Sequence, residues 1–152
     1  MDTVVSRALM YAMEKHAGQV YPRRDENWPF ITHPIRVALR VAGLSYDKTT
    51  LIIALLHDVV EDTDATIGDI RFRFGDVVST AVSRLSREEG DSYKDYIKNL
   101  AGHPVARLVK IADLQDNLHH CRINSAPDFT KSLIARYIWA LGYLMGDEKE
   151  LR

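Results

Sequence analysis

The apolar residues of this chain recur mainly at spacings of three and four, which is the period of one face of a helix. The first stretch with this spacing contains Val5, Leu9, Ala12, Met13 and His16. Asp2 or Thr3 can cap the start of that helix, and Gly18 stands just past its end. Further stretches predict helices at about 34–42, 48–60, 66–74, 76–85, 92–100, 104–121 and from 127 onward.

The stretch at 48–60 is apolar almost all round, so we expect it to be the central helix of the fold. No clear run of alternating apolar and polar residues bounded by turn residues is evident, which argues against strands. Residues 18–32 carry glycine and prolines amid charged residues, and they predict a long loop. The pattern therefore predicts an all-α fold of about eight helices, with residues 1–152 forming a single domain.

The composition fits an ordinary globular domain, because 46% of the 152 residues are hydrophobic and 27% are charged. A net charge of −1 gives no support to a nucleic-acid partner, since such binders are usually basic. The longest apolar run, residues 51–56, is far shorter than the roughly 20 residues that a membrane span needs. The single cysteine, Cys121, fits a reducing compartment, and no signal-peptide pattern is visible, so we expect a cytoplasmic protein.

A polar cluster at the end of the most hydrophobic stretch is the first candidate for chemistry. It consists of His57, Asp58, Glu61 and Asp62. Members four residues apart share a helix face, so one helix end can present a histidine and three carboxylates toward one hollow. The alternative is a solvated helix terminus, although acidic groups at a helix C-terminus oppose the macrodipole.

Three other places carry residues that commonly bind metals, and one of them is His16 at the end of the first predicted helix. Asp113 lies in the predicted helix 104–121, with Lys110 three residues before it and Asn117 four residues after it. His33 precedes Pro34, which holds its backbone extended. Taken alone, Asp113 and His33 each have a plainer interpretation, as part of a solvated stripe or as an ordinary loop histidine.

The order of several motifs along the chain favours the functional interpretation. These motifs are His16-Ala-Gly-Gln19, Pro29-Phe-Ile-Thr-His33-Pro34, Ala54-Leu-Leu-His-Asp-Val-Val-Glu-Asp-Thr63, Phe74-Gly75 and Lys110-Ile-Ala-Asp113. Together they resemble the HD-type metal-dependent phosphohydrolases and, more narrowly, the hydrolase domain of the RelA/SpoT-type alarmone enzymes and their small stand-alone relatives. The run from His57 to Thr63 is the most specific part of this resemblance.

The resemblance implies an HD-type helical domain around one metal ion. The ligands that it implies are His33, His57, Asp58 and Asp113. Two imidazoles and two carboxylates make a mixed nitrogen and oxygen site, which suits Mn²⁺ or another divalent metal better than a closed structural zinc. Glu61 and Asp62 match the family's acid/base pair.

The resemblance also implies a substrate, a guanosine tetra- or pentaphosphate whose 3′-pyrophosphate is removed by hydrolysis. The residues that match substrate-contacting positions are Arg23, Arg24 and Asn117. Arginine suits a phosphorylated nucleotide, because it can both stack on a base and make bidentate contacts to phosphate.

Several positions depart from the family's pattern, including Leu85-Ser86-Arg87 in place of its Val-Thr-Lys element. Asn27 stands where a glycine is usual, while Leu114 and Asp116 replace an arginine and a histidine of the motif that contains Asp113. We therefore expect metal binding to be unaffected and the substrate pocket to differ. Two alternatives stay open, a phosphohydrolase that acts on another nucleotide or dinucleotide and a non-catalytic nucleotide-sensing module. The sequence predicts no oligomeric state.

Overall fold

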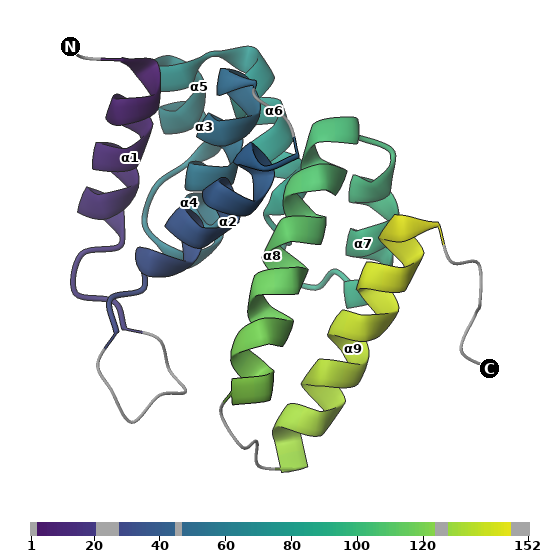
Figure 1. Cartoon of the computed structure of the whole chain (residues 1–152). Helices are drawn as coiled ribbons and strands as arrows, with labels where there is room; N and C mark the ends of the chain where they lie inside the picture. The colour runs from purple at the N-terminus through teal and green to yellow at the C-terminus, as the bar shows by residue number, and fades with distance from the viewer. Residues whose placement is uncertain (1–2, 21–27, 45–46, 124–127, 147–152) are drawn as a thin grey trace.

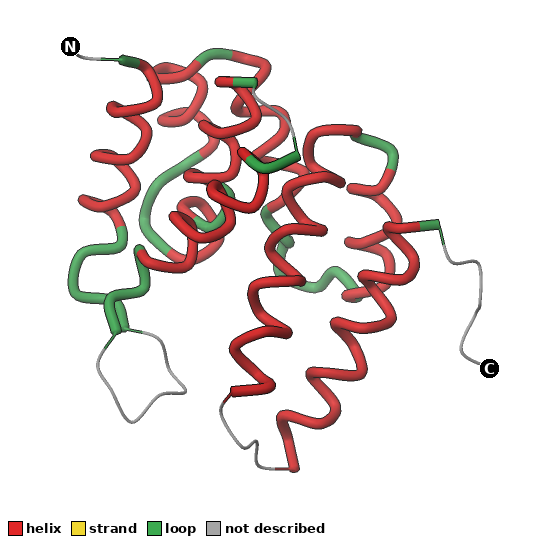
Figure 2. The backbone as a smooth tube through the Cα atoms, in the orientation of Figure 1, coloured by secondary structure: helices red, strands yellow, loops and turns green. Residues whose placement is uncertain are grey.

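The computed structural model describes residues 3–20, 28–44, 47–123 and 128–146. Within these ranges every regular element is a helix, as Figure 2 shows. In chain order the helices are α1 (Val4–Lys15), α2 (Thr32–Ala42), α3 (Lys48–Leu56), α4 (Val59–Asp62), α5 (Ile67–Phe74), α6 (Asp76–Leu85), α7 (Tyr93–Ala101), α8 (Pro104–Ile123) and α9 (Asp128–Met145). The all-α prediction is confirmed, and none of these helices is long and apolar enough to cross a membrane.

Helix starts follow the polar residues that the sequence offers. The hydroxyl of Thr3 accepts a hydrogen bond from the backbone N–H of Ser6, so Thr3 caps α1, whereas Asp2 lies outside the described residues. At α5, Thr66 and Asp69 form a reciprocal capping box. The carboxylate of Asp47 accepts hydrogen bonds from two backbone N–H groups at the start of α3. Each cap satisfies backbone groups that have no partner inside the helix.

The helix predicted over 48–60 is divided in the structure. α3 ends at Leu56, and α4 begins at Val59 after a turn made by His57 and Asp58. The backbone of Asp58 has φ −99° and ψ −6°, which departs from regular helix geometry. This interruption falls on the two residues that carry candidate chemistry, and the apolar pattern on either side gave no sign of it.

α3 is the central helix, as its apolar sequence predicts. All residues from Ile52 to Leu56 are buried in the larger of two hydrophobic clusters. α3 packs against α1, α2, α6 and α8. Its C-terminal end leads into the buried side chain of His57, and Figure 1 shows α3 lying among these elements.

A second hydrophobic cluster lies between α7, α8 and α9. Leu114 belongs to it, together with Ile97, Leu100 and Leu144. The preceding residues Val109 and Ala112 of α8 belong instead to the larger cluster. Figure 1 shows α8 running between the two groups of helices, so Asp113 lies at the boundary between the two clusters.

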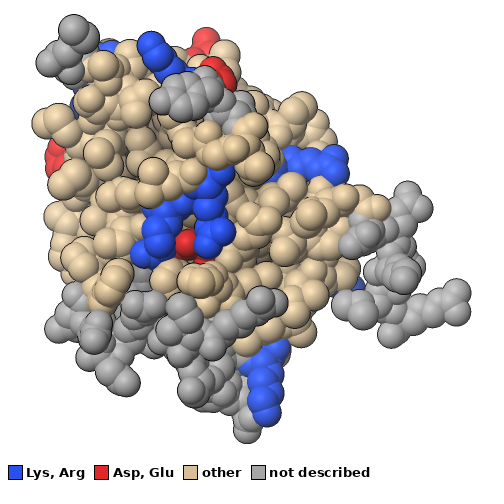
Figure 3. All heavy atoms as spheres, in the orientation of Figure 1, with Lys and Arg blue, Asp and Glu red and all other residues tan. Residues whose placement is uncertain are grey.

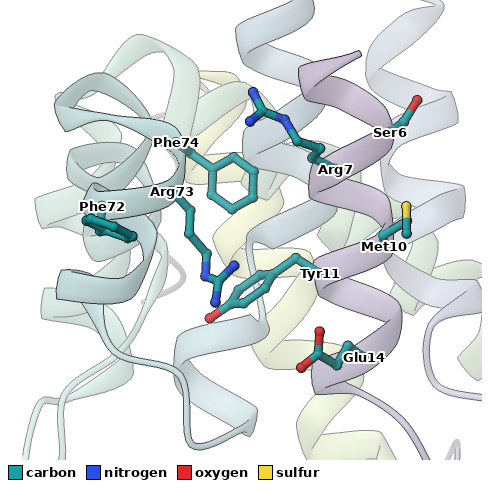
Figure 4. Close-up of a pocket in the computed structure, with 8 residues that line it drawn as sticks. All are labelled: Ser6, Arg7, Met10, Tyr11, Glu14, Phe72, Arg73 and Phe74. Carbon is teal, nitrogen blue, oxygen red and sulfur yellow. The ribbon is translucent and has the colours of Figure 1, made fainter. Parts of the chain in front are cut away.

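A surface hollow beside α1 contains none of the predicted site residues. It is lined by Ser6, Arg7, Met10, Tyr11, Glu14, Phe72, Arg73 and Phe74, as Figure 4 shows. The Arg73 guanidinium lies 4.8 Å from the centroid of the Tyr11 ring, and the rings of Tyr11 and Phe74 meet edge to face at 5.8 Å. These contacts join α5 to α1.

Candidate metal centre

The four predicted metal ligands converge from three separate segments of the chain. His33 comes from α2, His57 and Asp58 come from the turn after α3, and Asp113 comes from α8. Nε2 of His33 lies 2.9 Å from Oδ1 of Asp113 and 3.5 Å from Oδ2 of Asp58. Nε2 of His57 lies 3.2 Å from Oδ2 of Asp58 and 3.6 Å from Oδ1 of Asp113.

Both imidazole rings are oriented through their other nitrogen. Nδ1 of His57 donates a hydrogen bond to the carbonyl oxygen of Ala54 at 2.7 Å. Nδ1 of His33 donates to Oδ2 of Asp116 at 2.8 Å. Each ring therefore turns Nε2 toward the carboxylates, which is how histidine ligands are commonly fixed at metal sites.

Asp113 is held in place by its own helix. Its Oδ2 accepts a hydrogen bond from Nζ of Lys110 at 2.7 Å, and its Oδ1 accepts one from Nδ2 of Asn117 at 2.9 Å. Burial alone would raise the pKa of Asp113, but the Lys110 cation and the two histidines hold it well below its usual range. Asn117, the predicted substrate contact, thus lies against a predicted metal ligand.

Carboxylates surround the histidines and change their protonation. Burial would lower the pKa of His33 and of His57, yet the neighbouring Asp58 and Asp113 raise both pKa values above the usual one for histidine. The site therefore attracts positive charge at the point that the two Nε2 atoms face. Among the described residues, Nε2 of His57 is buried and has no hydrogen-bond partner. A divalent cation fits this donor set, because it would satisfy both imidazoles and both carboxylates.

Glu61 and Asp62 lie at the end of α4, beside the ligands. Their carboxylate oxygens and one oxygen of Asp58 all lie within 4.8 Å of one another. Oε1 of Glu61 accepts a hydrogen bond from the backbone N–H of Arg87 at 2.7 Å. Partial burial of the Asp62 carboxyl, together with the charges of Asp58 and Glu61, raises its pKa to about 7. The carboxyl groups of Glu61 and Asp62 therefore lie close together beside Asp58.

The structure describes only some of the residues predicted to shape the substrate pocket. Arg23, Arg24 and Asn27 lie outside the described residues. Leu114 is fully buried in the cluster between α7, α8 and α9. Its side chain therefore faces a hydrophobic core and not a pocket.

Asp116 is the residue whose role at the centre sequence reasoning missed. It is completely buried, and besides His33 it accepts a hydrogen bond from Nε of Arg36 at 3.0 Å. Burial would raise its pKa, but the hydrogen bonds from His33 and Arg36 lower the pKa to about 2. Its place three residues after Asp113 on the same helix was a signal for this role. Asp116 therefore contacts the metal centre rather than only a substrate pocket.

His16 and Gln19 form a second contact that the sequence did not assign. His16 is buried, and its Nδ1 lies 2.8 Å from Oε1 of Gln19. Nε2 of Gln19 donates to the backbone carbonyl oxygen of Asp62 at 2.9 Å. The end of α1 thus supports the end of α4, where the carboxylate pair lies.

Comparisons with known proteins identify the family of this chain. The family model for the HD domain matches residues 8–95. The chain is 38% identical over 122 residues to a guanosine-3′,5′-bis(diphosphate) 3′-pyrophosphohydrolase of Aquifex aeolicus, a match that covers 75% of this chain and 17% of that protein. It is 36% identical over 141 residues to a Drosophila melanogaster protein of the same name, covering 87% of this chain and 78% of that one.

A solved structure is also similar along nearly the whole chain. It is that of a metazoan ortholog of SpoT that hydrolyzes ppGpp, with a TM-score of 0.83 and 28% identity. The match covers 98% of this chain and 89% of the other. By contrast, the chain spans less than a fifth of the length of the first curated relatives that it matches.

Proposed function

Because the chain belongs to the HD domain family, we propose that it is a metal-dependent hydrolase that removes the 3′-pyrophosphate of guanosine 3′,5′-bis(diphosphate). The observation that carries this proposal is the convergence of two imidazoles and two carboxylates beside a separate pair of carboxyl groups. The names of the Aquifex and Drosophila relatives and of the metazoan structure support the choice of substrate.

In this proposal His33, His57, Asp58 and Asp113 hold the metal, and Mn²⁺ is the ion that we expect. When bound, such an ion supplies Lewis-acid activation of water and of the phosphoryl group. Lys110 and Asn117 keep the Asp113 carboxylate in its place. Asn117 can additionally contact the substrate, and Arg23 and Arg24 are proposed to bind its base and phosphates.

Hydrolysis at the 3′ position breaks the bond between phosphorus and the 3′ oxygen and forms GDP and pyrophosphate. One proton must leave the attacking water, and one must reach the departing 3′ oxygen. Glu61 and Asp62 are proposed to carry these protons, because they lie beside the ligands and Asp62 has a pKa of about 7. A cytoplasmic location is proposed from the single cysteine, which cannot form an intramolecular disulfide.

The test is steady-state hydrolysis of guanosine 3′,5′-bis(diphosphate) by the purified protein with added Mn²⁺. We expect GDP and pyrophosphate as products and no turnover after chelation of the metal. A panel of other phosphorylated nucleotides and dinucleotides runs in parallel. Turnover of one of these compounds alone would favour the alternative, a phosphohydrolase that acts on another nucleotide or dinucleotide. The sequence argument for that alternative is that Asp116 replaces the family's histidine. Binding of nucleotide with no turnover would indicate a sensing module.

A further inference from the structure

The carboxylate of Asp116 is outside the predicted ligand set, yet it touches one of the ligands. Asp116 is fully buried, and its Oδ2 lies 2.8 Å from Nδ1 of His33. A carboxylate can only accept a hydrogen bond, so Nδ1 of His33 must carry the hydrogen. In a neutral ring, Nε2 then keeps its lone pair free on the side that faces Asp58 and Asp113.

The Asp116 carboxylate is itself held by arginines from α2. Nε of Arg36 lies 3.0 Å and 3.1 Å from the two carboxylate oxygens, and Nε of Arg40 lies 3.5 Å from Oδ1. His33, Arg36 and Arg40 are spaced by three and four residues, so they share the face of α2 that packs against α8. Figure 3 shows basic side chains gathered around a small acidic patch on this side of the molecule.

This arrangement explains how a third aspartate can be buried beside two others. A buried carboxylate without partners is costly, whereas one that is paired with cations and fully hydrogen-bonded is tolerated. The arginine side chains are only partly exposed, at 25% and 35%, while the Asp116 side chain is at 0%. The cations thus cover the carboxylate from the solvent side, and its contact with His33 points inward.

We propose that Asp116 is a positioning residue that fixes the tautomer and ring orientation of His33, so that Nε2 is presented to the metal. This inference rests on the proposed function, because it assigns a role at the same metal centre. His57, the other histidine of the centre, is oriented by a main-chain group, because its Nδ1 donates to the backbone carbonyl of Ala54. Only the His33 contact can therefore be removed by changing a side chain.

The experiment compares wild-type protein with Asp116→Asn. An asparagine keeps the shape but can either accept from Nδ1 or donate to it, so it no longer selects one tautomer. Partners of metal-binding histidines are commonly worth about 10- to 100-fold in metal affinity or activity. We expect the dissociation constant for Mn²⁺, measured by titration calorimetry, to rise by about 10- to 100-fold in this variant. Saturating Mn²⁺ should recover most of the hydrolytic rate.

A spectroscopic readout separates positioning from a general loss of structure. In the metal-free wild type with the His33 ring neutral, nitrogen-15 NMR should show hydrogen on Nδ1 and none on Nε2. The same ring in Asp116→Asn should show a mixture. The matched control is Asp76→Asn, because Asp76 is an exposed carboxylate whose ion pair with Arg71 lies between α5 and α6. It should change neither readout.

The outcomes distinguish this inference from the proposed function. If the wild type binds no divalent metal, the proposed function itself fails. If the wild type binds metal and hydrolyses the nucleotide, but Asp116→Asn has the same affinity and the same His33 tautomer, the positioning role is overturned. Should Asp116→Asn fail to fold, the wild-type spectrum decides, because hydrogen on Nε2 of the neutral, metal-free ring contradicts the inference. Arg36→Gln supplies a second variant, and it should weaken Mn²⁺ binding in the same direction.

Discussion

At the scale of single residues, each charged group at the centre is fixed by a different neighbour. A backbone carbonyl orients His57, the Lys110 ammonium and the Asn117 amide hold Asp113, and a backbone N–H binds Glu61. His57 and Asp113 are groups that would hold a metal, whereas Glu61 is a group that would move protons. Substitution of one side chain at a time can test this difference in role.

Replacement of the carboxylate pair should reduce rate and leave metal binding intact. Glu61→Gln and Asp62→Asn keep the size of each side chain but remove its proton-transfer capacity. Because proton transfer by a positioned group typically contributes about 10²- to 10⁴-fold, we expect kcat to fall within that range. Metal content, measured by elemental analysis, should match the wild type. Near wild-type turnover by both single variants would show that neither residue transfers the proton.

The raised pKa of Asp62 predicts a pH dependence of stability in the metal-free protein. Its folded-state pKa of about 7 lies above the ordinary value, so the folded state binds more protons than the unfolded state. The stabilisation from this group is full at low pH and is lost as pH rises through about 7. We therefore expect the thermal midpoint to fall more between roughly pH 5 and pH 8 in the wild type than in Asp62→Asn.

Asp64→Asn is the control for this measurement. The hydrogen bond and charge of Lys15 lower the pKa of Asp64, so its carboxylate is ionised in both states over the same pH range. This variant should show the same pH dependence as the wild type. An equal pH dependence in Asp62→Asn would mean that the Asp62 carboxyl has an ordinary pKa.

The resemblance carried by the motifs and their order along the chain predicted the four ligands and the carboxylate pair, and the structure brings these six residues close together. The motifs did not reveal the role of Asp116, because its partner His33 lies in a distant segment and only the packing of α2 against α8 brings them together. The same limit applies to Leu114. Its replacement of the family's arginine suggested a change in the substrate pocket, but adjacent residues on a helix point in different directions, and Leu114 faces a hydrophobic cluster.

At the scale of elements, apolar spacing predicted most helices because each buries one face. The break at His57 and Asp58 was not predictable in this way, since helical periodicity continues through both residues. Adjacent residues of a regular helix point about 100° apart. The turn nevertheless brings Nε2 of His57 within 3.2 Å of Oδ2 of Asp58. The interruption is therefore what allows neighbouring residues to face one site.

The burial of Leu114 predicts a stability effect with little change in specificity. Leu114→Ala would leave a cavity between α7, α8 and α9, and such truncations typically cost about 2–5 kcal/mol. We expect the free energy of unfolding in urea to fall by that amount, while relative activity toward different nucleotides stays unchanged. His119→Ala, at an exposed position of α8, should change neither. Altered nucleotide preference without a loss of stability would place Leu114 at the substrate pocket.

At the scale of the whole molecule, the candidate metal centre joins segments that are far apart in sequence. α2, the turn between α3 and α4, and α8 each contribute predicted ligands, and α8 also packs against α9. Without a cation, three aspartates and two histidines are gathered in a largely buried place. Metal binding should therefore stabilise the packing of α2 and α8 against the central helix as well as the site itself.

Metal loading should consequently raise the stability of the wild-type protein and not that of ligand variants. A ligand that binds only the folded state stabilises it by about 2.7 kcal/mol at a concentration of 100 times its dissociation constant. We expect Mn²⁺ to raise the thermal midpoint of the wild type, and chelation to reverse this. His57→Ala and Asp58→Ala should show little or no rise and should contain less metal by elemental analysis. Full metal retention by both variants would contradict the proposed centre, because each variant removes a predicted ligand from the turn between α3 and α4.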